Sequence, residues 1–374
     1  MLGVTALAIF LPLATAKTGL IVDTDIGGGA CMDVDDVAAV CAANAIADSG
    51  KADLLAIVQN TQPASCTGVI SALLHHYGRD DLPIGAYKGD GLDHSGQLSY
   101  VDDLASNFPA PIKNSSQVPD AVDVYRSVLA AAPDRSVAIS SIGLMTNLEL
   151  LLRSGPDRHS PLSGTDLVAK KVKVLAAMAG AYPNLHAPGV VAAMAGAYPN
   201  QRAPGGVTKE CNMCGCYNGA DAKSSATAGG SSAYVYSNMP ASVKLIFSGF
   251  EVGVNVRSGA VLETCAPVSS PCRQAFMDYK RDNSGGWAPR GRCSWDPLTT
   301  LVAALGVSDD LGVAECANCS GYNHVDPDGS NHWVPGAATN QSYLVLDDAD
   351  VAGKAIDALL CQPPKRHARG VVEA

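Results

Sequence analysis

The sequence predicts a single α/β domain with a mainly parallel central sheet flanked by helices. Short runs rich in β-branched residues alternate along the chain with alanine-rich segments of helix length, which is the pattern of strands joined by crossover helices. Hydrophobic residues make up 47% of the 374 residues and charged residues only 17%, so the chain can bury a large core. No linker long enough to separate two domains interrupts this pattern.

The alternating segments predict an order of elements. The expected strands are residues 19–22, 54–58, 137–140, 172–176 and 243–247. The expected helices are residues 37–47, 69–77 and 121–131. The Gly/Ser-rich stretch 224–232 is expected to be a loop, because strand-like sequence resumes soon after it.

The N-terminal segment resembles a secretory signal. Residues 1–16 form one apolar run that ends in Ala14-Thr15-Ala16, a small-x-small pattern that signal peptidase cleaves. We therefore expect a signal peptide over residues 1–16 and a secreted, extracellular domain over residues 17–374. Because no Lys or Arg precedes the run, a truncated gene model or a first buried strand stays open as an alternative. No later apolar run reaches the ~20 residues that a membrane span needs, so no membrane contact is expected of the mature chain.

The charge balance excludes one class of partner. The formal net charge is -10 at pH 7. A field of this sign repels a phosphate backbone, so a nucleic-acid polymer is not expected to bind.

The cysteine content suits an oxidising compartment. The chain has 12 cysteines, with two clusters, Cys211-Cys214-Cys216 and Cys316-Cys319. No cysteine–histidine pattern of zinc-finger spacing accompanies them, so disulfides or buried thiols are favoured over zinc.

One segment occurs twice. The string AAMAGAYPN occupies residues 176–184 and again residues 192–200. Two copies are too few for a stacked repeat, which needs at least ~3 units. Only one copy can therefore line any one site.

An acidic cluster follows the first expected strand. The string DTDIGGGACMDVDD holds five carboxylates: Asp23, Asp25, Asp33, Asp35 and Asp36. Carboxylates crowded at the C-terminal edge of a sheet raise one another's pKa, and a bound cation is the usual relief. Ligands that are all oxygen favour calcium or magnesium. Asp35 and Asp36 would also lie at the positive end of a helix dipole.

Two alternatives compete with a metal site. The string could be a solvated acidic loop with helix-capping aspartates, although five carboxylates and three glycines after a buried strand favour a site. It could also open a phosphotransferase of the haloacid dehalogenase type. That class has Thr or Val where this chain has Gly27, which makes magnesium-dependent phosphoryl transfer the weaker alternative.

Several segments in the same order resemble the inosine-uridine-preferring nucleoside hydrolase family. The matching strings are DTDIGG and DVDD within residues 23–36, VQNTQ at 58–62, IGLMTNLELLL at 142–152, MAGAYPN at 194–200, ECN at 210–212, FSGFEVG at 247–253 and SWDPLT at 294–299. They extend over most of the mature chain. The resemblance implies a nucleoside hydrolase-like, Rossmann-like arrangement of the predicted sheet.

The resemblance also implies a calcium site. Members hold Ca²⁺ through first-loop aspartates, a backbone carbonyl and a late aspartate, which are Asp25, Asp36, the carbonyl of Thr146 and Asp296 here. Asp25 is implied to be the general base that takes a proton from a calcium-bound water, whose pKa the ion has lowered. Asp23 is expected to orient these groups from behind.

Ribose recognition, by the same resemblance, falls to Asp35, Asn60, Asn200, Glu210 and Asn212. The repeat leaves Asn184 open in place of Asn200, which is chosen because it is nearer in sequence to Glu210. A sugar with three hydroxyls needs several fixed acceptors and donors, and carboxylates stabilise an oxocarbenium-like transition state. For Asn60 and Asn200, a turn residue that satisfies the local backbone is nearly as good an explanation. For Glu210 and Asn212, the alternative is an ordinary exposed strand edge. If that edge is extended, Glu210 and Asn212 share one face.

Two departures from the family pattern affect details of the site. The first loop carries about four extra residues, 29–32, so Asp33 could replace one of the implied ligands. Many members have a histidine just before the last aspartate, where this chain has Trp295. An indole is not a general acid, but it can stack on a nucleobase.

The implied reaction is hydrolysis of the N-glycosidic bond of free ribonucleosides to ribose and nucleobase, which would serve purine or pyrimidine salvage outside the cell. The alternative is a non-catalytic, calcium-dependent nucleoside or ribose binding protein that has lost turnover through Trp295 and the loop insertion. Relatives form dimers and tetramers, so the resemblance implies a homodimer or homotetramer.

Overall fold

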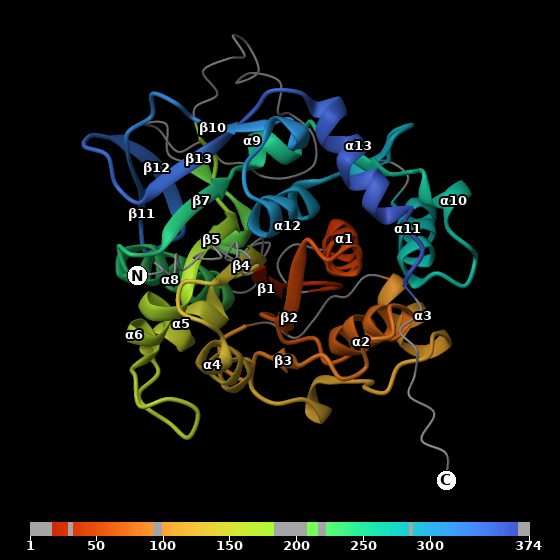
Figure 1. The fold of residues 1–374 in the computed structure, drawn as a ribbon, viewed down its shortest axis with the longest axis horizontal. Coiled ribbons are helices and arrows are strands. Elements are labelled where there is room, and N and C mark those ends of the chain that lie inside the picture. The colour runs from red at the N-terminus through yellow and green to blue at the C-terminus, as the bar shows by residue number, and fades with distance from the viewer. Residues whose placement is uncertain are drawn as a thin grey trace, which may run out of the picture.

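An eight-stranded sheet forms the centre of the protein (Figure 1). The computed structural model describes residues 17–28, 33–92, 99–182, 208–215, 222–283 and 287–365. The strands, in their order across the sheet, are β10 (Val313–Glu315), β13 (Gln341–Leu346), β7 (Lys244–Ser248), β5 (Val172–Met178), β4 (Val137–Ile142), β1 (Thr18–Thr24), β2 (Ala52–Gln59) and β3 (Ile84–Ala86). All neighbours pair in parallel except β10 with β13, which confirms the predicted fold class.

Helices cover both faces of this sheet (Figure 1). One face carries α1 (Asp35–Ser49), α2 (Cys66–His76), α11 (Pro271–Asp282), α12 (Trp295–Leu305) and α13 (Ala349–Leu360). The other carries α4 (Ala121–Ala131), α5 (Thr146–Arg153), α6 (Gly164–Lys171) and α8 (Ala222–Asn238). The shorter helices are α3 (Ser99–Asn107), α7 (Cys211–Cys214), α9 (Phe250–Gly253) and α10 (Leu262–Cys265), with 3-10 turns at Ser115–Gln117 and Asp309–Leu311.

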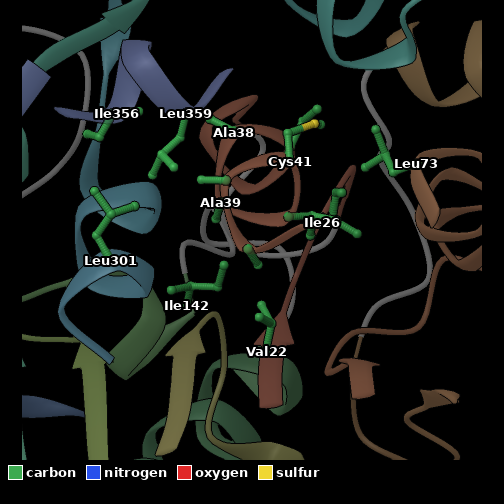
Figure 2. Close-up of a cluster of buried hydrophobic side chains, with 14 of the residues drawn as sticks. Val22, Ile26, Ala38, Ala39, Cys41, Leu73, Ile142, Leu301, Ile356 and Leu359 are labelled. Atoms are coloured by element: carbon green, nitrogen blue, oxygen red, sulfur yellow. The ribbon is translucent and has the colours of Figure 1, made fainter. Parts of the chain in front are cut away.

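Alternating side chains along each strand build two cores. In β4, Val137 and Ile139 pack under α4, α5 and α6, whereas Ala138 packs on the opposite face. On that opposite face, side chains of β1 and β4 meet those of α1, α12 and α13, as Figure 2 shows with Val22, Ile142, Ala39, Leu301 and Ile356. Helix α1 is buried along nearly its whole length, so its N-terminus is fixed firmly over the sheet.

Two small sheets and three disulfides complete the described fold. Strands β11 (Gly321–Val325), β12 (Ser330–Pro335) and β6 (Thr208–Lys209) form one sheet, and β8 (Arg257–Gly259) and β9 (Gly291–Cys293) the other. The described disulfides are Cys41–Cys272, Cys265–Cys361 and Cys316–Cys319. For the Cys316-Cys319 cluster this confirms a disulfide in place of zinc, and disulfides suit an oxidising compartment. Within the described residues, no helix combines the length and the apolar character needed to cross a membrane.

The Gly/Ser-rich stretch 224–232 is helical, so the predicted loop is wrong. It lies inside α8, which packs against α5 and β11. Ser224, Gly229 and Ser232 are buried, and a Cβ at Gly229 would lie 2.6 Å from the backbone of Asp328. Small residues let α8 approach its neighbours closely, and this packing outweighs their low helix propensity.

Three sequence predictions fall outside the described residues. These are the signal peptide over residues 1–16, the insertion over 29–32 and the pocket residue Asn200 with its copy of the repeat, residues 192–200. They stay predictions.

Candidate metal centre

Three buried carboxylates meet where the N-termini of α1 and α12 approach each other. Asp35, Asp36 and Asp296 each place one oxygen within 4.8 Å of the other two. Asp35 and Asp36 open α1, and Asp296 lies in the first turn of α12, 261 residues after Asp35. Both helix N-termini present partial positive charge to the carboxylates. The fold therefore brings Asp296 to the N-terminal acidic loop, as the resemblance implied.

The electrostatics of this group suit a cation. Burial and then the charge of Asp25 raise the pKa of Asp36 well above its ordinary value. Burial and the charges of Asp35, Asp36 and Asp25 do the same to the pKa of Asp296. A bound divalent ion relieves repulsion of this kind, and the donors are the hard oxygens that calcium and magnesium prefer.

Asp25 stands beside this group at the end of β1. Its side chain is buried, and its charge acts on both Asp36 and Asp296. A tight turn follows, in which the amide of Gly28 donates to the carbonyl of Asp25 (3.3 Å). The Thr24 hydroxyl donates to the Asp36 carboxylate, which ties β1 to α1 beside Asp25.

Asp23 is held behind the site by three donors. Its Oδ1 accepts from the amides of Asn60 (2.9 Å) and Asn147 (3.1 Å), and its Oδ2 accepts from the Tyr125 hydroxyl (2.8 Å). Burial raises the pKa of Asp23 to about 7, although these hydrogen bonds oppose the shift. This geometry agrees with an orienting role. Sequence reasoning missed Tyr125 and Asn147, since no local pattern ties them to Asp23.

Asn60 and Thr146 connect the loops that follow β2 and β4. The Asn60 Oδ1 accepts from the amide of Leu144 (3.2 Å), and its carbonyl accepts from the Thr146 hydroxyl (2.7 Å). A Cβ at Gly143 would lie 2.6 Å from the Asn60 amide and 2.7 Å from the nitrogen of Asp25, so the loop needs glycine there. A positioning role thus accounts for the Asn60 side chain. Its contact to ribose and the Thr146 carbonyl as a ligand stay predictions.

Glu210 and Asn212 do not lie on an exposed strand edge, which was the alternative to substrate contact, and both are buried. Glu210 precedes the short helix α7 and caps it, because its Oε1 accepts from the amide of Asn212 (2.9 Å). Its Oε2 accepts from the amide of Gly180 (3.1 Å), and burial raises the pKa of Glu210 to about 7. The Asn212 amide group donates to the carbonyl of Met178 (3.0 Å). Its Oδ1 is buried and has no hydrogen-bond partner among the described residues.

Glu251 is a second buried glutamate that sequence reasoning did not select, although it lies in the matching string FSGFEVG. Its Oε2 accepts from the amide of Tyr182 (3.1 Å). Its Oε1 is a buried atom without a hydrogen-bond partner in the described structure. Burial raises the pKa of Glu251 to about 8, and the charge of Glu210 adds to the shift. Glu210 and Glu251 therefore hold neighbouring amides of the segment that leaves β5.

Trp295 begins α12 directly before Asp296. Its backbone amide and that of Asp296 donate to Asp35 Oδ2 (3.0 and 3.2 Å), so Asp35 caps α12 from another part of the chain. The indole N–H donates to the carbonyl of Phe250 (2.9 Å), and the side chain is buried, with 7% of the residue exposed. Stacking of this indole on a nucleobase and contact of Asp35 with ribose stay predictions.

Comparisons with known proteins support the fold. No protein-family model and no curated protein matches the chain. Solved structures that match it over nearly their whole length include the following three. An inosine-guanosine nucleoside hydrolase has a TM-score of 0.58 at 16% identity, covering 92% of this chain and 98% of its own. The effector XopQ, solved with adenosine diphosphate ribose, has a TM-score of 0.58 at 15% identity, covering 93% of this chain and 95% of its own. The effector XOO4466 has a TM-score of 0.60 at 15% identity, covering 93% of this chain and 94% of its own. The chain thus has the nucleoside hydrolase fold.

Proposed function

We propose that this protein is a calcium-dependent ribonucleoside hydrolase, which cleaves the bond between ribose and the nucleobase. The observation that carries the proposal is the meeting of Asp35 and Asp36 with Asp296 in one buried group, beside Asp25. The shared fold with an inosine-guanosine nucleoside hydrolase supports it.

The donor set fits a hard divalent cation. The proposed ligands are Asp25, Asp36, Asp296 and the carbonyl of Thr146, all of them oxygen donors. The repulsion that raises the pKa of Asp36 and Asp296 would be offset by the ion. When bound, the cation supplies Lewis acidity, which lowers the pKa of a water molecule that it contacts.

In the proposed reaction, side chains of the protein accept a proton, hold the loops of the site and bind the sugar. Asp25 accepts the proton of the attacking water, while the hydrogen bonds among Asp23, Asn60 and Asn147 hold the loops around Asp25 in place. Glu210, Asn212 and other buried acceptors bind the sugar hydroxyls and stabilise positive charge as the glycosidic bond breaks.

The substrate proposed is an uncharged, free nucleoside. The described site is dominated by carboxylates, and the nearby cation Arg292 is already paired with Asp33. Such a site disfavours phosphate groups by like-charge repulsion. This argues against a diphosphate ligand of the kind found with XopQ.

The test is ribose release from inosine and uridine. We expect turnover in Ca²⁺, loss of turnover in EDTA and recovery when Ca²⁺ is restored. Asp25→Asn should lower kcat by about 10³-fold or more while the protein stays folded, because the general base is lost. The matched control is Asp53→Asn, which changes an exposed carboxylate on β2 and should retain normal turnover.

The other outcomes separate the competing functions. Near-normal turnover by Asp25→Asn would overturn the assigned base. Nucleoside binding by calorimetry without any ribose release would instead support the non-catalytic binder. Binding of adenosine diphosphate ribose but not of inosine would contradict the uncharged substrate.

A further inference from the structure

A buried ion pair lies beside the candidate metal centre. Arg292 of β9 contacts Asp33 through Nε, at 2.9 Å from both carboxylate oxygens, and through Nη2, at 2.5 Å from Oδ2. The side chains are only 7% and 11% exposed. The rings of Tyr279 and Trp295 lie 5.6 and 5.3 Å from the guanidinium carbon. Charged groups buried this deeply are retained in a fold only with good geometry, which this forked contact has.

The pair joins the two segments that supply the carboxylates. Asp33 lies two residues before Asp35, the first residue of α1, and Arg292 lies four residues before Asp296. The contact between Asp35 and the α12 amides joins the same two segments a second time. Two separate contacts therefore set the distance between Asp36 and Asp296.

Asp33 is accordingly not free to serve as the substitute ligand that the sequence suggested. Its carboxylate is engaged by the guanidinium, and its Oδ1 also accepts from the amide of Val34 (2.7 Å). The carbonyl of Asp33 accepts from the Tyr100 hydroxyl (3.0 Å). Asp33, two residues before α1, is therefore held by three partners: Arg292 of β9, the N-cap residue Val34 and Tyr100 of α3.

We propose that Arg292 and Asp33 are positioning residues for the cation, which hold the Asp35-Asp36 turn against Asp296 in a binding geometry. The inference deepens the proposed function and rests on its cation. Groups that orient metal ligands from behind typically change metal affinity by about 10- to 100-fold when they are replaced.

If Arg292 and Asp33 affected cation binding only through their charges, their variants would behave differently, so the two explanations can be separated by experiment. The charge of Asp33 acts on Asp35, Asp36 and Asp296. By charge alone, Arg292→Gln makes the site more negative and should strengthen cation binding, whereas Asp33→Asn should weaken it. By positioning, both variants should weaken binding. The double variant should then bind Ca²⁺ no more weakly than either single variant, because the same Arg292–Asp33 contact is lost in all three.

The experiment is calorimetry of Ca²⁺ binding to the full chain. We expect about 10-fold or greater weakening in Arg292→Gln, in Asp33→Asn and in the double variant. Arg292→Lys keeps the charge but loses the forked contact, so it should also bind Ca²⁺ more weakly and covers the case in which the glutamine variant does not fold. The matched control is Arg79→Gln, which breaks the buried Arg79–Asp48 pair at the other end of α1, 14% and 5% exposed, and should leave Ca²⁺ affinity unchanged.

Each result supports or overturns the inference. Normal or tighter Ca²⁺ binding by Arg292→Gln or Arg292→Lys would overturn it. Equal weakening by Arg79→Gln would also overturn it, since the effect would then be general destabilisation. If the unaltered protein binds Ca²⁺ but releases no ribose, the proposed reaction fails and the inference stands. If the unaltered protein binds no Ca²⁺, both fail.

Discussion

Replacing Asp296 with asparagine is predicted to stabilise the cation-free protein, although it removes a proposed ligand. Asp35, Asp36 and Asp296 each have an oxygen within 4.8 Å of the other two. At that separation, and with an effective dielectric constant of about 20, two like charges repel by about 3.5 kcal/mol. Protonation already relieves much of this repulsion. We therefore expect the free energy of unfolding to rise by about 2 kcal/mol at pH 8 in EDTA.

The gain should depend on pH in a defined direction. Burial and neighbouring charges raise the pKa of Asp296 above 3.8, its ordinary value, in the folded protein. Above pH 3.8 the folded state therefore binds more protons than the unfolded chain, and the free energy of unfolding falls as pH rises. Asp296→Asn should reduce this loss of stability with pH. The increase in its free energy of unfolding over the unaltered protein should therefore be small at pH 5 and largest at pH 8.

Urea unfolding in EDTA and in Ca²⁺ measures both effects. Ca²⁺ at about 100 times its Kd should stabilise the unaltered protein by about 2.7 kcal/mol and should leave Asp296→Asn nearly unchanged. Asp53→Asn again serves as the control. The reasoning would be refuted if Asp296→Asn were less stable than the unaltered protein at pH 8 in EDTA, or if Ca²⁺ stabilised both equally.

Variants of two further residues, Glu251 and Trp295, give predictions for stability and nucleobase binding. The pKa of Glu251 is about 8 in the folded protein and 4.5 ordinarily, so the folded state holds an extra proton between these values and stability falls as pH rises through them. Glu251→Gln should flatten this fall by up to about 1.4 kcal/mol per pH unit in urea titrations at pH 5.5, 6.5 and 7.5; an unchanged slope would contradict the assignment. Trp295→Phe leaves the Phe250 carbonyl without its indole donor and should lower the free energy of unfolding by about 1–2 kcal/mol. If the ring stacks on the base, Trp295→Ala should weaken inosine binding in calorimetry well beyond Trp295→Phe, and equal affinities would exclude the stacking.

The parallel sheet could be predicted because its signals are local. Apolar runs of strand length and the helices that follow them repeat from β1 to α2, and the structure has these elements within a few residues of the predicted bounds. The carboxylates after β1 were visible for the same reason, since the end of a parallel strand is where ligands bind. That Asp296 joins them followed only from a resemblance, because no local pattern reports a contact 261 residues away.

Predictions failed where packing decides the local structure. Gly and Ser favour loops in isolation, but in α8 they allow close contact with Asp328 and become helical. Glu210 caps a short helix by accepting the Asn212 amide, and the sequence analysis did not anticipate this helix. The Asp33–Arg292 pair spans 259 residues and has no signal in either segment.

The five carboxylates of the first loop have different partners, and these differences bear on which of them would hold a metal ion. Asp23 is occupied by amide and hydroxyl donors, Asp33 by a guanidinium, and one oxygen of Asp35 by the start of α12. After Asp35, the loop carboxylates whose charges raise the pKa of Asp296 most are Asp36 and Asp25. The contacts of Asp23, Asp33 and Asp35 already hold the first loop and the start of α12 in place. Cation binding therefore has to order little additional structure, and its entropic cost should be small. Such a site should bind its ion with the fold already formed. Ca²⁺ should therefore raise the free energy of unfolding without changing the far-UV circular dichroism spectrum.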